Sequence, residues 1–551
     1  MRTLLLGLSL LLLLQVSAQK TAPAALDSKL DKLVNEVFKA NGPGATVLIA
    51  RNGSVIYRKA VGLADIERNV PMKPEMVFRI GSITKQFTAV AILQLMEEGK
   101  LSLQDELTKY IPDYPVKGKK ITIEQLLTHT SGIRSYTDMG SFDDAMQAVD
   151  KTPAQLMDVF KNEPFDFEPG TQWHYNNSGY FLLGMIIEKI TGKPYGEFIE
   201  TRLLQPLRMT ASLYGSNTKL IPNRATGYDP SKNGVQVATY LSMTLPYAAG
   251  SLMSTVDDLF KWNRALKAGK LLKPETLEKA YTGYILPNGH DTHYGYGWFL
   301  GELGGQKVIH HSGGINGYLS DALYIPQSDL FVVALSNCTC NPPNDLVTHL
   351  AEAVLDIKTT YKQITVDSAA LKLFTGNFEN DLGEIRAITL NNGKLQSQRS
   401  GGPAYTLTPV GKDLFEISGT GSFFTFQRNE AGNIKGLTFK TGRQAPENWK
   451  RTDKPFTPAR TEINLPEAEL KQLEGEYQLT PAFGIVIRVK NGSLRAQATQ
   501  QPEFELFAEA PDHFFLKVVE AQVEFLRDPN GAVTHLMLHQ GGQHLKMKKI
   551  K

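Results

Sequence analysis

The stretch FRIGSITKQF, residues 78–87, places Ser82 three residues before Lys85. A serine hydroxyl is a weak nucleophile near neutral pH and needs a base within hydrogen-bond reach. Residues three apart lie on the same face of a helix, so Lys85 meets that need if a helix begins at Ser82. The following ITKQFTAVAILQLMEEGK is largely apolar and predicts a buried helix that ends near Gly99. Ser82 would then lie at the helix N-terminus, which favours developing negative charge, and Gly81 would allow a close approach of the backbone to substrate.

The same S-x-x-K spacing occurs twice more, and neither copy predicts a catalytic pair. Residues 17–20 (SAQK) fall at the end of an N-terminal targeting segment. Residues 216–219 (SNTK) are followed by Pro222, which would end a helix almost at once. For Ser82 the alternative is a plain helix-capping serine, so the pair needs support from other motifs.

The N-terminal segment MRTLLLGLSLLLLLQVSAQK is typical of a secretory signal peptide. It has one arginine, an unbroken apolar run from Leu4 to Leu14 and small residues up to Ala18. We expect residues 1–18 to be removed by cleavage near Ala18. The apolar run is short for a membrane span, and a retained N-terminal anchor is the alternative. The mature protein is expected to be soluble and exported, either periplasmic or secreted, without a transmembrane span.

The composition narrows the classes of partner. The 551 residues carry a net charge of +3 and no long basic run, which argues against a nucleic-acid partner. The only cysteines, Cys338 and Cys340, follow the run LFVVALSN and have no histidine nearby. They would make a weak metal site, so we interpret them as strand-end residues and predict no cofactor. The oligomeric state is left open.

The chain divides into an α/β part up to about residue 357 and a β-rich remainder. In the first part, ATVLIARNGSVIYRKAVG forms two alternating runs around Asn52-Gly53 and predicts an antiparallel hairpin. Later in this part, KVIHHSG, YLSDALYIP and LFVVALSN predict three short strands in succession. A helical middle flanked by strands from both ends predicts one antiparallel sheet packed against helices, an α/β (α+β) fold.

The remainder contains an internal repeat. LKLFTGNF at 371–378 matches LKQLEGEY at 470–477, and the same offset of 99 residues relates further identical pairs, among them Leu395 with Leu494 and Phe415 with Phe514. Short alternating runs separated by turn residues predict two small antiparallel barrels or sandwiches. The linker between them is predicted at TDKPFTPAR, because its prolines cannot donate to a sheet. The predicted domains are 19–357, 366–452 and 461–551, after the signal peptide 1–18.

Two further motifs could complete a site around Ser82. Tyr175-Asn176-Asn177 is the only Y-x-N in the chain and precedes a second helix that looks buried. A tyrosine can relay a proton when neighbouring cations favour its phenolate, although a half-buried tyrosine beside a capping asparagine is the alternative. His311-Ser312-Gly313 stands where a strand would end. H-x-G triplets also begin at residues 293 and 539, so a plain turn is the alternative here.

Together the three motifs resemble those of the penicillin-recognising serine hydrolases, which include class C β-lactamases, DD-carboxypeptidases, D-aminopeptidases and esterases. Their marks are S-x-x-K, Y-x-N and K-T-G or H-x-G, in this order. The stretches ITIEQLLTHTSGI, AAGSLMSTVDDLFKW and YGYGWFL are also similar to this family. The resemblance covers about residues 26–357 and implies a β-lactamase/transpeptidase-like domain.

The resemblance also implies roles for the matching residues. Ser82 would attack an acyl carbon, and Lys85 and Tyr175 would share the proton transfers, with the acylation base left open. Asn177 would orient Lys85 and the substrate, and His311 would replace the usual strand lysine. Gly313 would line the substrate site, and the backbone N–H groups of Ser82 and Gly314 would form the oxyanion hole.

His311 is a departure from the family pattern, because an unperturbed histidine is mostly neutral at pH 7. The replacement weakens a clamp for a substrate carboxylate and argues modestly against a dedicated β-lactamase. The two C-terminal modules resemble the lipocalin-like barrels of D-aminopeptidases, one of which helps to shape the active site. We therefore expect an exported peptidase or amidase that acts on small D-amino-acid-containing or cell-wall-type peptides. The alternatives are an esterase or β-lactamase, a low-turnover penicillin or peptide sensor, and a carbohydrate-binding structural protein.

Overall fold

The computed structural model describes residues 25–358, 361–418, 420–458, 462–480, 483–499, 501, 503–517, 521–540 and 543–551. The predicted signal peptide and residues 459–460 of the predicted linker lie outside this part. The chain packs as two compact units. One comprises residues up to 374 together with 379–383 and 407–451, and the other comprises 375–378, 384–406 and 452–551.

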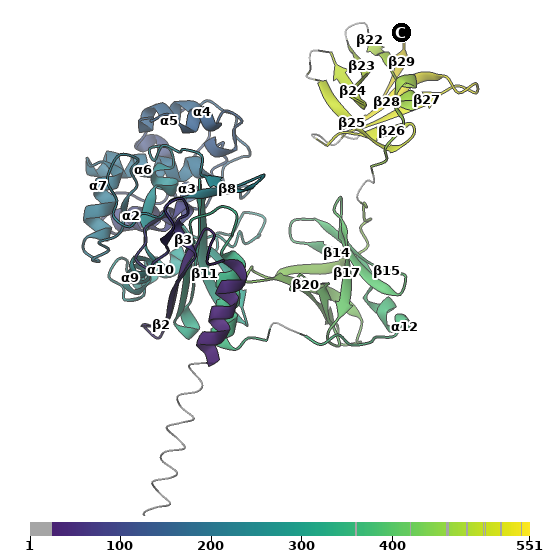
Figure 1. Cartoon of the computed structure of the whole chain (residues 1–551). Helices are drawn as coiled ribbons and strands as arrows, with labels where there is room; N and C mark the ends of the chain where they lie inside the picture. The colour runs from purple at the N-terminus through teal and green to yellow at the C-terminus, as the bar shows by residue number, and fades with distance from the viewer. Residues whose placement is uncertain are drawn as a thin grey trace, which may run out of the picture. The chain divides into compact units, whose positions relative to one another are not determined.

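Six antiparallel strands form the main sheet of the first unit, in the order β10-β11-β12-β13-β1-β2. Strands β2 and β11 of this sheet are labelled in Figure 1. The strands are β10 (Phe299–Leu303), β11 (Gln306–Ile315), β12 (Tyr318–Ile325), β13 (Leu330–Ser336), β1 (Ala45–Arg51) and β2 (Ser54–Val61). Asn52 and Gly53 join β1 to β2 with φ angles of 52° and 78°, the positive values that a tight hairpin turn requires. The predicted hairpin and the predicted antiparallel sheet are therefore confirmed.

Apolar side chains of the sheet alternate between two cores, as a two-sided sheet requires. Leu48 and Ala50 of β1 belong to the larger core, which includes much of the helical middle of the chain. Val47 and Ile49 belong to the other core, which is completed by the helix at 25–37 and by α11 (Asn344–Leu355). The sheet thus lies between two layers of helices.

The other helices and short strands of this region lie mainly between β2 and β10 in the sequence. The helices are α2 (Thr84–Glu97), α3 (Ile123–Leu127), α4 (Asp144–Gln147), α5 (Pro153–Phe160), α6 (Asn177–Thr191), α7 (Tyr195–Ile199), α8 (Tyr247–Gly250), α9 (Val256–Lys267) and α10 (Pro274–Ala280). The short strands are β3 (Leu63–Asp65), β4 (Val70–Pro71), β5 (Phe78–Arg79), β6 (Leu213–Tyr214), β7 (Tyr228–Ser231), β8 (Gly234–Val237) and β9 (Leu252–Ser254).

The repeated sequence forms two closed eight-stranded antiparallel barrels, which confirms the predicted fold class. The first barrel has β14 (Gly376–Asn380), β15 (Ile385–Asn391), β16 (Lys394–Arg399), β17 (Ala404–Pro409), β18 (Leu414–Ile417), β19 (Ser422–Arg428), β20 (Ile434–Thr441) and β21 (Glu447–Thr452), preceded by α12 (Ser368–Leu371). The second has β22 (Gly475–Thr480), β23 (Phe483–Lys490), β24 (Ser493–Ala498), β25 (Glu503–Ala510), β26 (His513–Phe515), β27 (Ala521–Arg527), β28 (Val533–Gln540) and β29 (Gln543–Lys549), preceded by α13 (Glu467–Gln472). The repeated apolar residues are buried in both barrels, for example Phe415 and Phe514.

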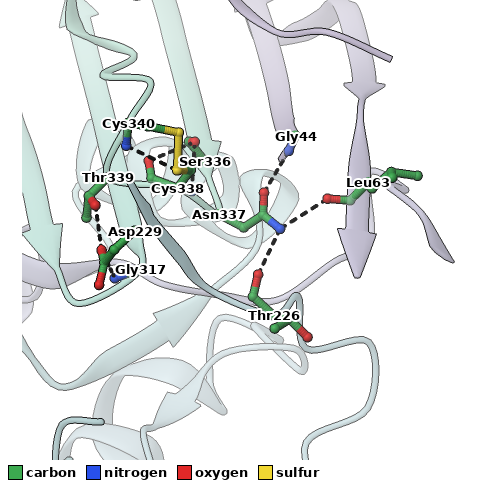
Figure 2. Close-up of a disulfide and its surroundings, with 10 residues drawn as sticks. All are labelled: Gly44, Leu63, Thr226, Asp229, Gly317, Ser336, Asn337, Cys338, Thr339 and Cys340. Atoms are coloured by element: carbon green, nitrogen blue, oxygen red, sulfur yellow. Dashed lines mark hydrogen bonds between the residues drawn. A yellow bond between two sulfur atoms is a disulfide. The ribbon is translucent and has the colours of Figure 1, made fainter. Parts of the chain in front are cut away.

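A disulfide joins the two cysteines just after the end of β13 (Figure 2). Cys338 is fully buried. Between the strand and the disulfide, Asn337 accepts a hydrogen bond from the Gly44 N–H at 2.7 Å and donates one to the Thr226 carbonyl at 2.8 Å. The sequence motifs did not indicate the disulfide between Cys338 and Cys340. The loop after β13 is thus fixed to the start of β1 and to the segment that leads into β7.

Candidate active site

Ser82 and Lys85 lie within hydrogen-bond distance of each other. Ser82 is in a 3₁₀ turn at Gly81–Ile83, and α2 begins at Thr84, so the helix starts two residues later than the sequence predicted. Lys85 Nζ nevertheless lies 3.0 Å from Ser82 Oγ, since the turn runs directly into the helix. The lysine side chain is fully buried.

Two glycines bring the Ser82 turn against strand β11. Gly81 has a φ of +50°, and a Cβ atom there would lie 2.9 Å from Gly314 N. A Cβ on Gly313 would lie 2.1 Å from the Ile80 carbonyl oxygen, too close for any side chain. The Ser320 hydroxyl of β12 donates to that same carbonyl at 2.8 Å. The backbone beside Ser82 therefore packs directly against Gly313 and Gly314, where the resemblance places the oxyanion hole.

Lys85 has three hydrogen-bond partners, and all of them are uncharged. Besides Ser82 Oγ, its Nζ lies 2.7 Å from Asn177 Oδ1 and 3.0 Å from the Ala249 carbonyl. Burial without a neutralising carboxylate holds the pKa of Lys85 well below its usual range. In the neutral amine, the two N–H groups would donate to Asn177 and Ala249, which accept only at these atoms. The lone pair would then face Ser82 Oγ and could accept its proton.

Asn177 is held in place by the segment 135–137. It is the first residue of α6, and its backbone N–H donates to Ser135 Oγ at 3.2 Å. Its side-chain Nδ2 donates to Thr137 Oγ1 at 2.9 Å, which leaves Oδ1 turned toward Lys85. The side-chain amide of Asn177 is therefore oriented by the Thr137 hydroxyl, which accepts from Nδ2, and by Lys85, which donates to Oδ1.

Tyr175 lies beside the lysine with its hydroxyl buried. Its ring centre is 4.7 Å from Lys85 Nζ. The hydroxyl makes no hydrogen bond of normal geometry to any residue that the structure describes. Burial raises the pKa of Tyr175, and the nearby Ser82 hydroxyl only partly offsets that rise. Tyr175 is therefore protonated at neutral pH and can donate a proton in this site.

His311 is neutral in this structure. Its Nδ1 lies 2.6 Å from the Ser312 carbonyl, which can only accept, so Nδ1 carries the proton. Its Nε2 then accepts a hydrogen bond from the Tyr294 hydroxyl at 3.1 Å. Burial, together with the charge of Lys85, lowers the pKa of His311 to about 3. The histidine expected to replace a strand lysine therefore brings no positive charge, and Tyr294 is a neighbour that the motifs did not indicate.

His129 is a second buried histidine that the sequence analysis did not single out. Its Nδ1 accepts the Asn176 N–H at 3.0 Å, its carbonyl accepts the His174 N–H at 3.0 Å, and its ring lies 4.5 Å from that of Tyr175. Burial and the charge of Lys85 hold its pKa well below the usual range. The only signal in the sequence was its place in ITIEQLLTHTSGI. His129 thus holds the Y-x-N segment on both sides of Tyr175.

The described residues contain no group of three or more histidine, cysteine, aspartate or glutamate side chains placed to hold a metal ion. The two sulfur atoms of Cys338 and Cys340 are bonded to each other. Within the same residues, no helix is both long enough and apolar enough to cross a membrane.

Comparison with known proteins gives two family matches. The family model described as Beta-lactamase matches residues 26–356, and one described as a domain of unknown function (DUF3471) matches residues 459–549. Over 421 residues the chain is 28% identical to penicillin-binding protein 4* of Bacillus subtilis (strain 168), covering 69% of this chain and 89% of that protein.

Solved structures of an amidohydrolase and an amidase are also similar to this chain. A D-stereospecific amidohydrolase from Streptomyces sp. is 31% identical, with a TM-score of 0.51, covering 58% of this chain and 97% of that one. The D-amino acid amidase from Ochrobactrum anthropi SV3, in complex with L-phenylalanine amide, is 26% identical, with a TM-score of 0.52, covering 60% and 99%.

Proposed function

Because this chain belongs to the beta-lactamase family, we propose that it is an exported serine hydrolase that forms an acyl-enzyme on Ser82. Its proposed substrates are short peptides or amides that contain D-amino acids, including fragments of cell-wall type. The observation that carries the proposal is the position of Lys85 Nζ, 3.0 Å from Ser82 Oγ and bonded otherwise only to uncharged acceptors. A serine that is bonded to a buried, unneutralised amine has the base that its chemistry requires.

In the proposed acylation, Ser82 Oγ attacks the acyl carbon while its proton passes to the neutral amine of Lys85. The backbone N–H groups of Ser82 and Gly314 stabilise the oxyanion, each donor typically contributing about 3 kcal/mol. The departing amine takes a proton from the Tyr175 hydroxyl, which regains one from the Lys85 ammonium. Water then attacks the ester carbonyl, and a proton returns to Ser82 Oγ as the acid leaves.

The substrate class is argued from the absence of charge around His311. The neutral histidine, bonded to Tyr294, offers no cation for a substrate carboxylate. Aromatic rings surround it, since Tyr175, Tyr294 and Phe299 all lie within 6.1 Å of the His311 ring, centre to centre. These surroundings favour a substrate without a carboxylate near His311, as in an amide of an amino acid. The similarity to a D-stereospecific amidohydrolase and a D-amino acid amidase supports an amide of a D-amino acid.

A low-turnover penicillin-binding protein is the second candidate, because the similarity to penicillin-binding protein 4* extends over 69% of this chain. Such a protein would acylate Ser82 and release the product slowly. Esterase and β-lactamase activities share the same first step. Export is proposed from the apolar segment at residues 1–18 alone, and a mature N-terminus at Gln19 would be its mark.

The proposal is tested by intact-protein mass and product release with D-alanine p-nitroanilide, its L enantiomer and a penicillin. We expect an adduct and many turnovers with the D substrate, and a loss of at least about 10³-fold in Ser82→Ala. Ser216→Ala is the matched control, because this serine begins the discarded S-x-x-K and bonds only locally, to Thr218 and Lys219.

Each alternative has its own result. A lasting penicillin adduct without turnover of any substrate would replace the hydrolase with the low-turnover binder. Full hydrolysis by Ser82→Ala would overturn the acyl-enzyme mechanism. Equal rates on the two enantiomers would remove the D-amino-acid specificity and leave the serine mechanism intact.

A further inference from the structure

The turn between β20 and β21 packs against strand β10, within the same compact unit. The Glu302 N–H donates to the Arg443 carbonyl at 3.1 Å, and Gly301 pairs with Gln444 in an antiparallel bridge. A Cβ atom on Gly301 would lie 2.0 Å from the Arg443 carbonyl oxygen, so glycine is needed for this approach. Lys440 adds an ion pair with Glu302 at 2.8 Å. The turn of the first repeat thus pairs with the edge strand of the catalytic sheet.

From this turn, the Arg443 side chain enters the catalytic region and forms a buried ion pair. Its Nη1 and Nη2 lie 2.5 and 2.6 Å from the two carboxylate oxygens of Asp321 on β12. The side chains are 7% and 0% exposed. Burial raises the pKa of Asp321, and the charge of Arg443 opposes that rise. Asp321 therefore depends on Arg443 to remain an ionised carboxylate in the interior.

Asp321 lies on β12, next to the segment of β11 that packs against the Ser82 turn. In the register of β11 and β12, Asp321 is opposite Ser312, between the pairs His311–Ala322 and Gly313–Ser320. Because side chains alternate across a sheet, Asp321 and His310 share the face opposite to that of His311. The charge of Arg443 also acts on His310, contributing to its lowered pKa. The ion pair therefore supports the part of β11 that packs against the Ser82 turn.

We propose that Arg443 is a positioning residue for acyl transfer at Ser82, and that the β20–β21 turn is thereby part of the support of the active site. The inference rests on the proposed acyl-enzyme function. Arg443 neutralises Asp321 and joins the β20–β21 turn to β12. Residues 311–314 of β11 are then held in the position from which the Gly314 N–H can donate a hydrogen bond to the oxyanion. A misplacement of reacting groups by about 1 Å can cost on the order of 100-fold in rate.

The test compares Arg443→Met, Arg443→Lys and the double variant Asp321→Asn/Arg443→Met in the full chain. Arg428→Met is the matched control, because Arg428 pairs with Asp413 inside the same barrel at 2.7 Å. The first readout is the rate of Ser82 acylation at saturating p-nitrophenyl ester, per folded molecule. The second is amide hydrogen exchange of residues 306–325.

We expect Arg443→Met to acylate at least about 10-fold more slowly and to exchange faster at residues 306–325. Arg443→Lys should lie between it and the wild type. The double variant should recover part of the rate, because it buries no unpaired charge. Arg428→Met should match the wild type in both readouts. A role in folding alone would reduce the folded fraction and leave the rate per folded molecule unchanged.

Wild-type rates per folded molecule in Arg443→Lys and in the double variant would overturn the proposal, even if Arg443→Met fails to fold. If the wild type forms no adduct with any probe, the proposed function fails, and hydrogen exchange then decides the structural claim. Unchanged exchange at residues 306–325 would overturn it, and faster exchange would support it.

Discussion

The two barrels have the same fold and similar apolar cores, and they differ in the turn that follows the seventh strand, which in the first barrel pairs with β10 of the main sheet. The repeat preserves more than apolar residues. Arg428 pairs with Asp413 and donates to the Gly432 carbonyl, and Arg527 pairs with Asp512 and donates to the Gly531 carbonyl. Each of these residues lies 99 positions from its counterpart.

The difference lies in the turn that follows β20. Arg443 has Gly542 at the equivalent position of the second repeat, so the side chain that reaches Asp321 has no counterpart there. Residues 379–383 and 407–451 of the first barrel belong to the compact unit of the main sheet, whereas its residues 375–378 and 384–406 are grouped with residues 452–551. A duplicated module can thus keep its core and change its role through one turn. We expect the part of the first barrel at residues 407–451 to respond together with the main sheet, and the second barrel to respond separately.

Lowering the pH should give the largest difference in stability between the two units. His129, His310 and His311 are buried, and burial lowers the pKa of each. The unfolded chain binds these protons near the ordinary value of about 6.5. Unfolding therefore takes up protons, and stability falls as the pH drops below about 6.5, by roughly 1.4 kcal/mol per pH unit for each histidine that stays neutral in the folded state. All the histidines of the second barrel are exposed or half-buried.

Tryptophan fluorescence can follow the first unit alone, because the four tryptophans, at positions 173, 262, 298 and 449, all precede the second barrel. We expect the denaturation midpoint of the first unit, followed by this fluorescence, to fall steeply between pH 6.5 and 5. Hydrogen exchange in β27 and β28 should change much less over that range. Equal losses of stability in both units would contradict the expected difference between them.

Truncation should give the next largest effect. A chain that ends after residue 458 keeps the first barrel, the ion pair of Arg443 and all four tryptophans. We expect it to acylate Ser82 within about 2-fold of the full chain. A chain that ends after residue 358 lacks Arg443 and leaves Asp321 without its ion-pair partner, so a loss on the order of 100-fold is expected. Circular dichroism controls for folding, and equal rates in the two truncated chains would contradict the distinction between the barrels.

The sequence predicted those features whose signals are local or repeated. Asn52-Gly53 specifies a hairpin because both positions take positive φ, and the offset of 99 residues revealed two similar modules. Ser82 and Lys85 are close because one helical turn separates them. By contrast, the order of the motifs alone does not place Asn177 on Lys85, 92 residues away; the resemblance supplied that expectation.

The remaining features depend on tertiary contacts that leave no local pattern. Arg443 and Asp321 are 122 residues apart, and neither belongs to a motif. His129 lies in a family-like stretch, but its hydrogen bond from Asn176 spans 47 residues. The neutral state of His311 follows from its burial, which the triplet H-x-G does not encode. Cys338 and Cys340 could be recognised as a pair, but their bond depends on the conformation of the loop after β13.

The smallest expected effect comes from removing the Arg–Asp ion pair that occurs at the same position in each barrel. Arg428 and Asp413 are 27% and 24% exposed, and Arg527 and Asp512 are 28% each. Removing such a half-buried pair with its backbone bond should cost about 1 kcal/mol in either barrel. If the first barrel unfolds with the catalytic sheet, Arg428→Met lowers the urea midpoint of tryptophan fluorescence and Arg527→Met leaves it unchanged. Hydrogen exchange in β27 and β28 should show the reverse. A shift of the fluorescence midpoint by both variants would mean that the second barrel is energetically coupled to the first unit, and the difference at position 443 would then not account for how the two barrels behave.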